Sequence, residues 1–271
     1  MILGTGPAAA KTCVSLGLCK LLGDRGVVTT PFKAIAVIRP DAVPPGVDRL
    51  HSAPGVVHQI GSLGIAPEAV MNPVAVWQVD DDHGEILVMG EPIGTVKLLN
   101  RDAIRFECLS AQQKEQIGDA IQRAYAELRG RFEAIVIEGA GSPVETAEGD
   151  DWANQRLLRM SGAPAVLVGR FSNGGAAAAL VGTLRCLSPE LRSHVVGLVL
   201  SDVKDHDSAR HAALLATRES GVPMAGIIPR LRHGVDGINV TDYSIAYSAW
   251  AQALAAHVDL RVFGEPFAGS S

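Results

Sequence analysis

Short apolar runs alternate along this chain with longer segments of helical period, and this alternation constrains the fold most strongly. Strands that are apolar on both faces and separated by helices form parallel sheets with helices on each side. We therefore expect a single α/β domain over residues 1–264, followed by a flexible tail at 265–271. Strands are predicted at 1–4, 34–38, 86–90, 133–138, 164–169, 195–201 and 223–228, and helices at 11–24, 110–130, 151–161, 174–188, 207–220 and 242–257.

Composition narrows the class of protein. A chain of 271 residues can bury one good core, and nothing in it requires a second domain. The formal net charge of −5 argues against nucleic acid or a membrane surface as a partner. No apolar stretch reaches the roughly 18 residues that span a bilayer. The four cysteines form no CxxC pair, which favours reduced thiols and a cytoplasmic location.

The segment GTGPAAAKT, residues 4–12, follows the first strand and leads into a predicted helix. In a phosphate-binding loop, backbone N–H groups curl around phosphate oxygens, a Lys reaches the outer phosphates, and a Ser or Thr hydroxyl binds Mg²⁺. Lys11 and Thr12 fit the last two roles. Ala10 stands where the pattern requires Gly, and a positive φ there would cost about 1 kcal/mol. The alternative is an ordinary strand–loop–helix turn.

Glu138 ends another apolar strand and begins the sequence EGAGSP. A carboxylate at this edge of a parallel sheet can bind Mg²⁺ opposite Thr12, directly or through water. The N–H groups of the glycine-rich turn that follows can bind a carboxylate or an acyl phosphate. The alternative is a tight turn with a solvated Glu.

Several further motifs, in this order, carry a resemblance to a known family. The chain resembles the N-terminal synthetase half of cobyric acid synthase and its smaller relative dethiobiotin synthetase. The resemblance extends over most of the chain, and EGAGSP is its most specific mark. The other matching segments are Pro31-Phe32-Lys33, Met71-Asn72-Pro73-Val74, 90–94, Asp151-Trp152-Ala153-Asn154, Gly174-Gly175, 180–183 and 226–229.

This resemblance implies a single-domain P-loop NTPase-like fold with a deviant Walker A loop, and an ATP-dependent ligase that uses Mg²⁺. ATP would phosphorylate a small-molecule carboxylate, and ammonia or an amine would then displace the phosphate to form an amide. The implied catalytic residues are Lys11, Lys33 and Glu138, and the implied metal ligands are Thr12 and Glu138. Implied nucleotide contacts are Gly4, Thr5, Gly6, Ala10, Lys11, Thr12, Cys13 and Ser201. Implied substrate contacts are Lys33, Asn72, Gly139, Ala140, Gly141, Ser142, Gly174 and Gly175.

The sequence also departs from the family pattern. Ala8 replaces an Asp, Ser172-Asn173 replaces an Asp-Arg pair, and Ser201-Asp202 replaces an Asn-Arg pair associated with the nucleotide base. No Cys has the GxCxG context of the glutamine amidotransferase half, so nitrogen would come from ammonia, an amine or a separate glutaminase subunit. A homodimer is expected. Two other hypotheses stay open: a relative that binds a metabolite or partner without ATP turnover, and a ring-closing ligase like dethiobiotin synthetase.

The Pro-rich segment 40–58 lacks clear periodicity and is expected to be a functional or mobile loop. It contains His51 and His58 as candidate substrate or metal contacts, with surface histidines as the alternative. Asp41 and Asp48 are further candidate Mg²⁺ ligands. The run Asp80-Asp81-Asp82 is interpreted as a solvated turn.

Overall fold

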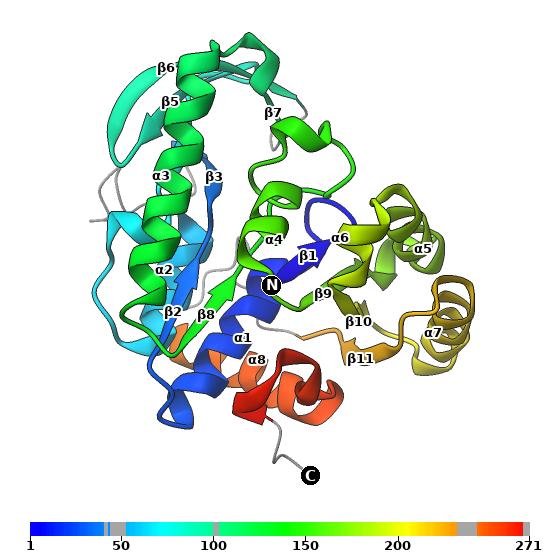
Figure 1. The fold of residues 1–271 in the computed structure, drawn as a ribbon. Helices are drawn as coiled ribbons and strands as arrows, with labels where there is room; N and C mark the ends of the chain where they lie inside the picture. The colour runs from blue at the N-terminus through cyan, green and yellow to red at the C-terminus, as the bar shows by residue number, and fades with distance from the viewer. Residues whose placement is uncertain (41–42, 44–52, 100–102, 232–242, 268–271) are drawn as a thin grey trace.

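A computed structural model describes residues 1–40, 43, 53–99, 103–231 and 243–267. Its central layer is a parallel sheet (Figure 1). Four strands pair in the order β1-β9-β10-β11, β2 pairs with β8, and a parallel bridge between Ile2 and Glu138 joins the two groups. The expected parallel α/β sheet is therefore confirmed. The strands are β1 (Ile2–Gly4), β2 (Thr29–Phe32), β8 (Ala134–Ile137), β9 (Ala165–Arg170), β10 (Val195–Val203) and β11 (Met224–Pro229).

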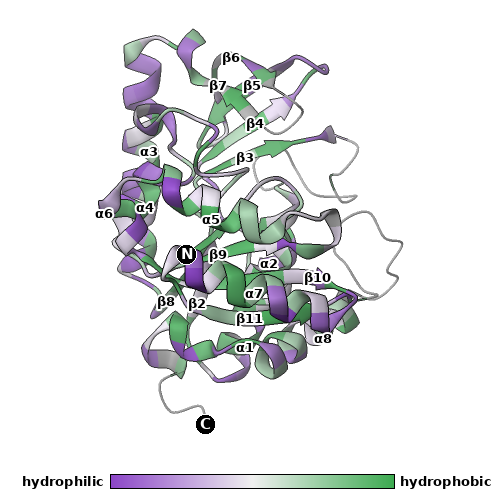
Figure 2. Ribbon diagram, turned by 90° about the vertical axis from the view of Figure 1, so that its right-hand side faces the viewer, coloured by the Kyte–Doolittle hydropathy of each residue, from purple (hydrophilic) through white to green (hydrophobic). Residues whose placement is uncertain are grey.

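Side chains that alternate along these strands fill two separate cores. Ile2, Val166 and Val199 belong to the core beneath one face, whereas their neighbours Leu3 and Leu167 belong to the core on the other face. This period of two is what a sheet covered on both sides requires. Helices α1 (Lys11–Asp24) and α8 (Tyr243–His257) cover the first face, and Figure 2 shows the apolar strands between the helical layers. The other core includes residues of α3 (Ala111–Arg129), α4 (Gln155–Ser161), α5 (Ala176–Cys186), α6 (Pro189–Ser193) and α7 (His206–Ser220).

A second sheet, which the sequence did not predict as a unit, extends from the end of β2. Its order is β3-β4-β5-β6-β7, with β3 and β4 parallel and the remaining pairs antiparallel. Only β3 and part of β5 were predicted. The tight turn at Met89-Gly90, where φ is 51° and 87°, makes a hairpin of β5 and β6. The strands are β3 (Ile35–Ile38), β4 (Val74–Gln78), β5 (His83–Val88), β6 (Glu91–Leu99) and β7 (Ala103–Arg105).

Two local expectations differ from the structure. Residues 54–58, expected in a loop, begin the helix α2 (Pro54–Leu63), with Pro54 in its first turn, where a missing N–H costs nothing. The expected tail begins with a 3₁₀ turn at Glu265–Phe267, and Phe267 is buried against the Arg25 guanidinium. Residues 268–271 lie outside the described residues.

No helix in the described part of the chain is long and apolar enough to span a membrane.

Candidate functional site

The phosphate loop connects β1 to α1 at the carboxyl edge of the central sheet. Ala8 and Ala10 both have positive φ, 57° and 71°, and Ala10 is the N-cap residue of α1. Left-handed residues in a loop before a helix help to turn successive N–H groups toward an anion. The strain expected at Ala10 is therefore present, and a Cβ in this conformation costs about 1 kcal/mol.

Lys11 links the phosphate loop to the acidic loop. Its Nζ donates to the carbonyl oxygen of Gly6 at 2.9 Å and to that of Gly141 at 2.8 Å. Lys11 is buried, and its charge interacts with these two carbonyl oxygens and with the Glu138 carboxylate. Phosphate oxygens are stronger acceptors for an ammonium group than neutral carbonyls, so an anion can displace these two bonds.

Glu138 is the centre of the site, and it is 1% exposed. Its Oε1 accepts hydrogen bonds from Thr12 Oγ1 at 2.8 Å and from Lys33 Nζ at 2.7 Å. Its Oε2 accepts a short hydrogen bond from Gln59 Nε2. Burial alone would raise the pKa of Glu138, but the Lys33 charge, the hydrogen bonds from Lys33 and Thr12, and the Lys11 charge together hold the pKa below its usual value. The carboxylate is thus ionised and fully bonded inside the protein.

Asn154 fixes the shape of the acidic loop. Its Oδ1 accepts from Ala140 N at 3.1 Å, and its Nδ2 donates to Ala140 O at 2.7 Å. A Cβ at position 139 would lie 2.2 Å from Asn154 Oδ1, which explains Gly139. Asp151 in turn accepts hydrogen bonds from Asn154 and Gln155, and burial raises its pKa to about 6. The sequence singled out Asp151 and Asn154 only as family marks.

The remaining predicted contacts fall into different surroundings. Asn72 is buried and donates through Nδ2 to Lys33 O and Val74 O, so it supports the backbone at Lys33. Ser201 has no exposed surface, and its hydroxyl donates to Ala9 O, so it braces the phosphate loop from behind. Cys13 packs in the core below α1, and Ser142 is buried in the acidic loop. Gly174 and Gly175 precede α5, and their positive φ values, 73° and 65°, shape that turn.

A charged cluster lies where the family carries its Asn-Arg pair. Asp202, itself at a φ of 58°, pairs with Arg170 and Arg230 and accepts a short hydrogen bond from Ser172. The Arg230 guanidinium, then Ser172 and Arg170, hold the pKa of Asp202 well below its usual range. Arg170 also lies 3.5 Å from Ala8 O, next to the phosphate loop. The sequence marked Asp202 as a departure but gave no sign of its arginine partners.

The structure describes some of the remaining histidines and aspartates that the sequence singled out. Asp80 accepts hydrogen bonds from the N–H groups of Asp82 and His83, which confirms the predicted turn. His58 is buried on α2 and its Nδ1 lies 3.1 Å from the Tyr247 hydroxyl, so it is not a surface histidine. His51, Asp41 and Asp48 lie outside the described residues.

The oxygen atoms around Glu138 fit Mg²⁺. Among the described residues, no group of three or more His, Cys, Asp or Glu side chains gathers as a metal site. Mg²⁺ instead needs only one or two protein oxygens, because it keeps several waters. Thr12 and Glu138 supply such oxygens side by side, and Gln59 Oε1 is buried without a hydrogen-bond partner in the described structure. A Cβ at Gly55 would lie 3.0 Å from Thr12 Cγ2 and 3.6 Å from Glu138 Oε2, so glycine lets α2 approach both groups closely.

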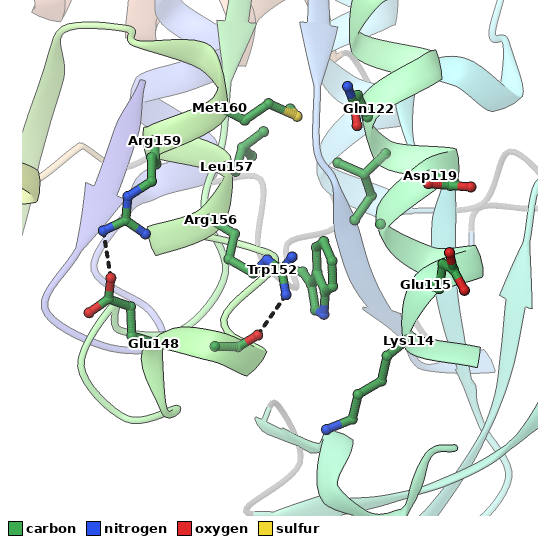
Figure 3. A pocket seen from close by; sticks show the side chains of 13 residues that line it. Lys114, Glu115, Asp119, Gln122, Glu148, Trp152, Arg156, Leu157, Arg159 and Met160 are labelled. Carbon is green, nitrogen blue, oxygen red and sulfur yellow. Dashed lines mark hydrogen bonds and ion pairs between the residues drawn. The ribbon is translucent and has the colours of Figure 1, made fainter. Parts of the chain in front are cut away.

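A groove of about 760 Å³ lies between α3 and α4, away from the phosphate loop (Figure 3). Trp152 lines it, with the Arg156 guanidinium 3.2 Å from the centre of the indole ring. Glu115 and Asp119 on α3 are the acidic side chains of one wall. Trp152 belongs to the same turn as Asn154, so the groove adjoins the residues that hold the acidic loop.

Comparison with known proteins assigns the family. A family model described as an AAA domain matches residues 100–236, half of the chain. The chain belongs to this family, and the resemblance to the synthetase half of cobyric acid synthases is confirmed. Cobyric acid synthase from Moorella thermoacetica is 32% identical over 238 residues, which cover 87% of this chain and 44% of that protein. Cobyric acid synthase from Roseiflexus castenholzii is 34% identical over 231 residues, or 84% and 45% of the two chains.

The chain therefore spans less than half the length of these curated relatives. Among solved structures, the signal recognition particle receptor FtsY from Elizabethkingia anophelis in complex with GDP has 12% identity and a TM-score of 0.46, covering 93% of this chain and 62% of that one. Cell division protein ftsY from Thermotoga maritima has 14% identity and a TM-score of 0.43, with coverages of 93% and 67%.

Proposed function

We propose that this chain is an ATP-dependent carbon–nitrogen ligase that activates a small carboxylate as an acyl phosphate and joins it to ammonia or an amine. One observation carries the proposal. Thr12 from α1, Lys33 from the end of β2 and Glu138 from the end of β8 meet within 2.8 Å, and Lys11 bonds to the loop that follows Glu138. Cations and a buried carboxylate at the edge of a parallel sheet are what phosphoryl transfer needs.

The reaction has two steps, phosphoryl transfer and amide formation. A carboxylate oxygen attacks the γ-phosphorus of ATP, the bond to the β–γ bridging oxygen breaks, and ADP leaves. The nitrogen lone pair then attacks the acyl carbon, phosphate leaves with the bonding electrons, and the nitrogen loses a proton. Mg²⁺, when bound, neutralises charge on the phosphate oxygens.

The lysines supply the positive charge that both steps require. Lys11 exchanges two carbonyl oxygens for phosphate oxygens. The Lys33 side chain, which is 16% exposed, lies between the Glu138 carboxylate and solvent and can hold the incoming carboxylate against the transferred phosphoryl group. The backbone of residues 139–142, shaped by Asn154, offers N–H groups to the acyl phosphate.

A second candidate is binding without ATP turnover. It is favoured by the left-handed Ala10 in the phosphate loop and by the Asp202 carboxylate, which is engaged by two arginines where the family has its base-associated residues. The two candidates make opposite predictions for ADP formation. The ring-closing alternative differs from both because its turnover would require bicarbonate.

The test is ADP release from Mg·ATP with pools of small carboxylates, each with and without ammonia or amines. The ligase predicts ADP that depends on both co-substrates and disappears in Lys33→Met. A folded protein that releases no ADP with any pool would reject the ligase in favour of binding alone.

We also propose a homodimer, a cytoplasmic location and, where ammonia is not used directly, a separate glutaminase subunit. The groove supports self-association, because its two walls differ in net charge. The α3 wall carries Lys114, Glu115 and Asp119 and is net acidic, whereas the facing wall carries Glu148, Arg156 and Arg159 and is net basic. Two copies related by a two-fold axis could pair the acidic wall of one with the basic wall of the other. Light scattering would give twice the mass of the chain, and Arg156→Glu would yield monomers.

A further inference from the structure

Gln59 has an unbalanced hydrogen-bonding arrangement beside Glu138. The residue has no exposed surface. Its Nε2 donates to Glu138 Oε2, while its Oε1 has no hydrogen-bond partner among the described residues. A buried acceptor without a donor loses the hydrogen bond that water would give it in the unfolded chain. The oxygen and nitrogen share one carbon, so the vacant acceptor is necessarily close to the carboxylate.

The surroundings favour a hydrated cation as the source of the missing donor. Thr12 Oγ1 and the two carboxylate oxygens of Glu138 already form an oxygen-rich corner. Gly55, in the first turn of the same helix, lets the backbone of α2 approach Thr12 and Glu138 Oε2 closely. Mg²⁺ retains bound waters in most protein sites, and each such water is a hydrogen-bond donor. A carboxylate that binds a metal is in turn held by a neighbouring hydrogen bond, and Gln59 Nε2 provides one.

We propose that Gln59 is a positioning residue for Mg²⁺: its amide nitrogen orients the Glu138 carboxylate, and its carbonyl oxygen accepts from a water on the metal. This inference rests on the proposed function, since it requires Mg·ATP as the ligand. It adds Gln59, on α2, as a residue that supports the candidate Mg²⁺ ligands Thr12 and Glu138. The unpartnered oxygen then has its donor when the metal is present.

The test compares ATP affinity with Mg²⁺ and with EDTA by calorimetry, which needs no turnover. Gln59→Leu removes both polar atoms with a side chain of similar size. We expect it to lower the Mg²⁺-dependent gain in ATP affinity about tenfold or more, the range for residues that support metal ligands, while ATP affinity in EDTA stays the same. Gln59→Glu loses the donor to Glu138 but places a second carboxylate beside it, and Mg²⁺ relieves the repulsion between the two charges. The gain from Mg²⁺ in this variant is therefore expected to equal or exceed that of the wild type. Tyr247→Phe is the matched control, because it removes the hydroxyl next to His58 on α2 without touching Glu138.

The outcomes separate the two claims. An equal Mg²⁺-dependent gain in wild type and folded Gln59→Leu, checked by thermal unfolding, overturns the role of Gln59 and leaves the ligase intact. A loss of the Mg²⁺-dependent gain in Tyr247→Phe as large as that in Gln59→Leu assigns Gln59 a packing role only and also overturns the proposal. No ATP binding by the wild type in either buffer rejects this inference together with the proposed function.

Discussion

Replacing Lys33 with Met is expected to lower the free energy of unfolding by about 3 kcal/mol at pH 7. Lys33 Nζ lies 2.7 Å from Glu138 Oε1, and the two side chains are 16% and 1% exposed, so water cannot replace the lost cation. Removing one partner of a buried ion pair costs about 3–5 kcal/mol. The lower end applies because Thr12 and Gln59 still donate to the carboxylate. The melting temperature should fall by roughly 6–12 °C, at about 2–4 °C per kcal/mol for a domain near this size.

The loss of stability in Lys33→Met is expected to depend on pH. The lowered pKa of Glu138 in the wild type contributes stability that is present above its ordinary pKa of 4.5 and is lost as the pH falls through the lowered value. Without Lys33, burial dominates and the pKa of Glu138 rises, so the variant is penalised most at neutral pH. The difference in stability between the two proteins should therefore shrink between pH 7 and pH 5.

Urea unfolding at both pH values measures this difference. The double variant Lys33→Met/Glu138→Gln removes both charges and should recover most of the loss, because no uncompensated ion remains buried. A loss below about 1 kcal/mol at pH 7 would mean that Glu138 is solvated and would refute the reasoning. A double variant as unstable as the single one would assign the loss to packing of the Lys33 stem.

Three further predictions concern the two loops. Ala10→Gly should raise the free energy of unfolding by roughly 0.5–1 kcal/mol, since it relieves a left-handed Ala but increases chain entropy in the unfolded state. The control Ala9→Gly should lower the free energy of unfolding. A stabilised control would contradict the assignment of backbone strain to Ala10. Asn154→Ala should cost about 2 kcal/mol in urea unfolding and speed hydrogen exchange at the Ala140 amide, and unchanged exchange there would show that the loop holds its own shape. The Asp151 carboxyl should titrate near pH 6 by NMR. The ionised group therefore destabilises the fold at pH 7, and this penalty fades as the pH falls toward 3.8, the pKa of the unfolded state. A titration midpoint below 4 would be inconsistent with the burial of Asp151.

The sequence predicted five of the six strands of the central sheet, because these strands are apolar on both faces. The strand β2 was missed, since Thr29, Thr30 and Pro31 interrupt the apolar pattern there. The sequence also placed α1 at residues 11–24, as observed, since the phosphate-loop pattern sets the start of that helix. The second sheet was missed as a unit because polar residues and a glycine interrupt the apolar pattern of β6, and β7 is a strand of three residues at the edge of the sheet. The strand β4 is apolar from Val74 to Trp77, but it is short and follows a proline. The helix α2 was missed because Pro54 and Gly55 are typical of loops, although Pro is well suited to a first helical turn.

Site residues that belong to a recognisable sequence motif could be predicted. Residues whose partners come from distant segments of the chain could not. Lys11, Thr12 and Glu138 belong to recognisable loops, and the structure brings them together. Gln59 carries no motif, and only the fold places it on Glu138 from 79 residues away. The pairing of Asp202 with Arg230 likewise depends on β10 and β11 being neighbours in the sheet.

Calorimetric titration of Mg·ATP into the purified chain and its Lys11→Ala variant tests the central claim most directly. Lys20→Ala on the same helix is the control, because Lys20 pairs only with Asp24 among the described residues. We expect the wild type and Lys20→Ala to bind Mg·ATP. The affinity of Lys11→Ala should be at least about tenfold lower, because a charged hydrogen bond to phosphate is removed. An absence of binding by the wild type, or equal binding by Lys11→Ala, would contradict the central claim.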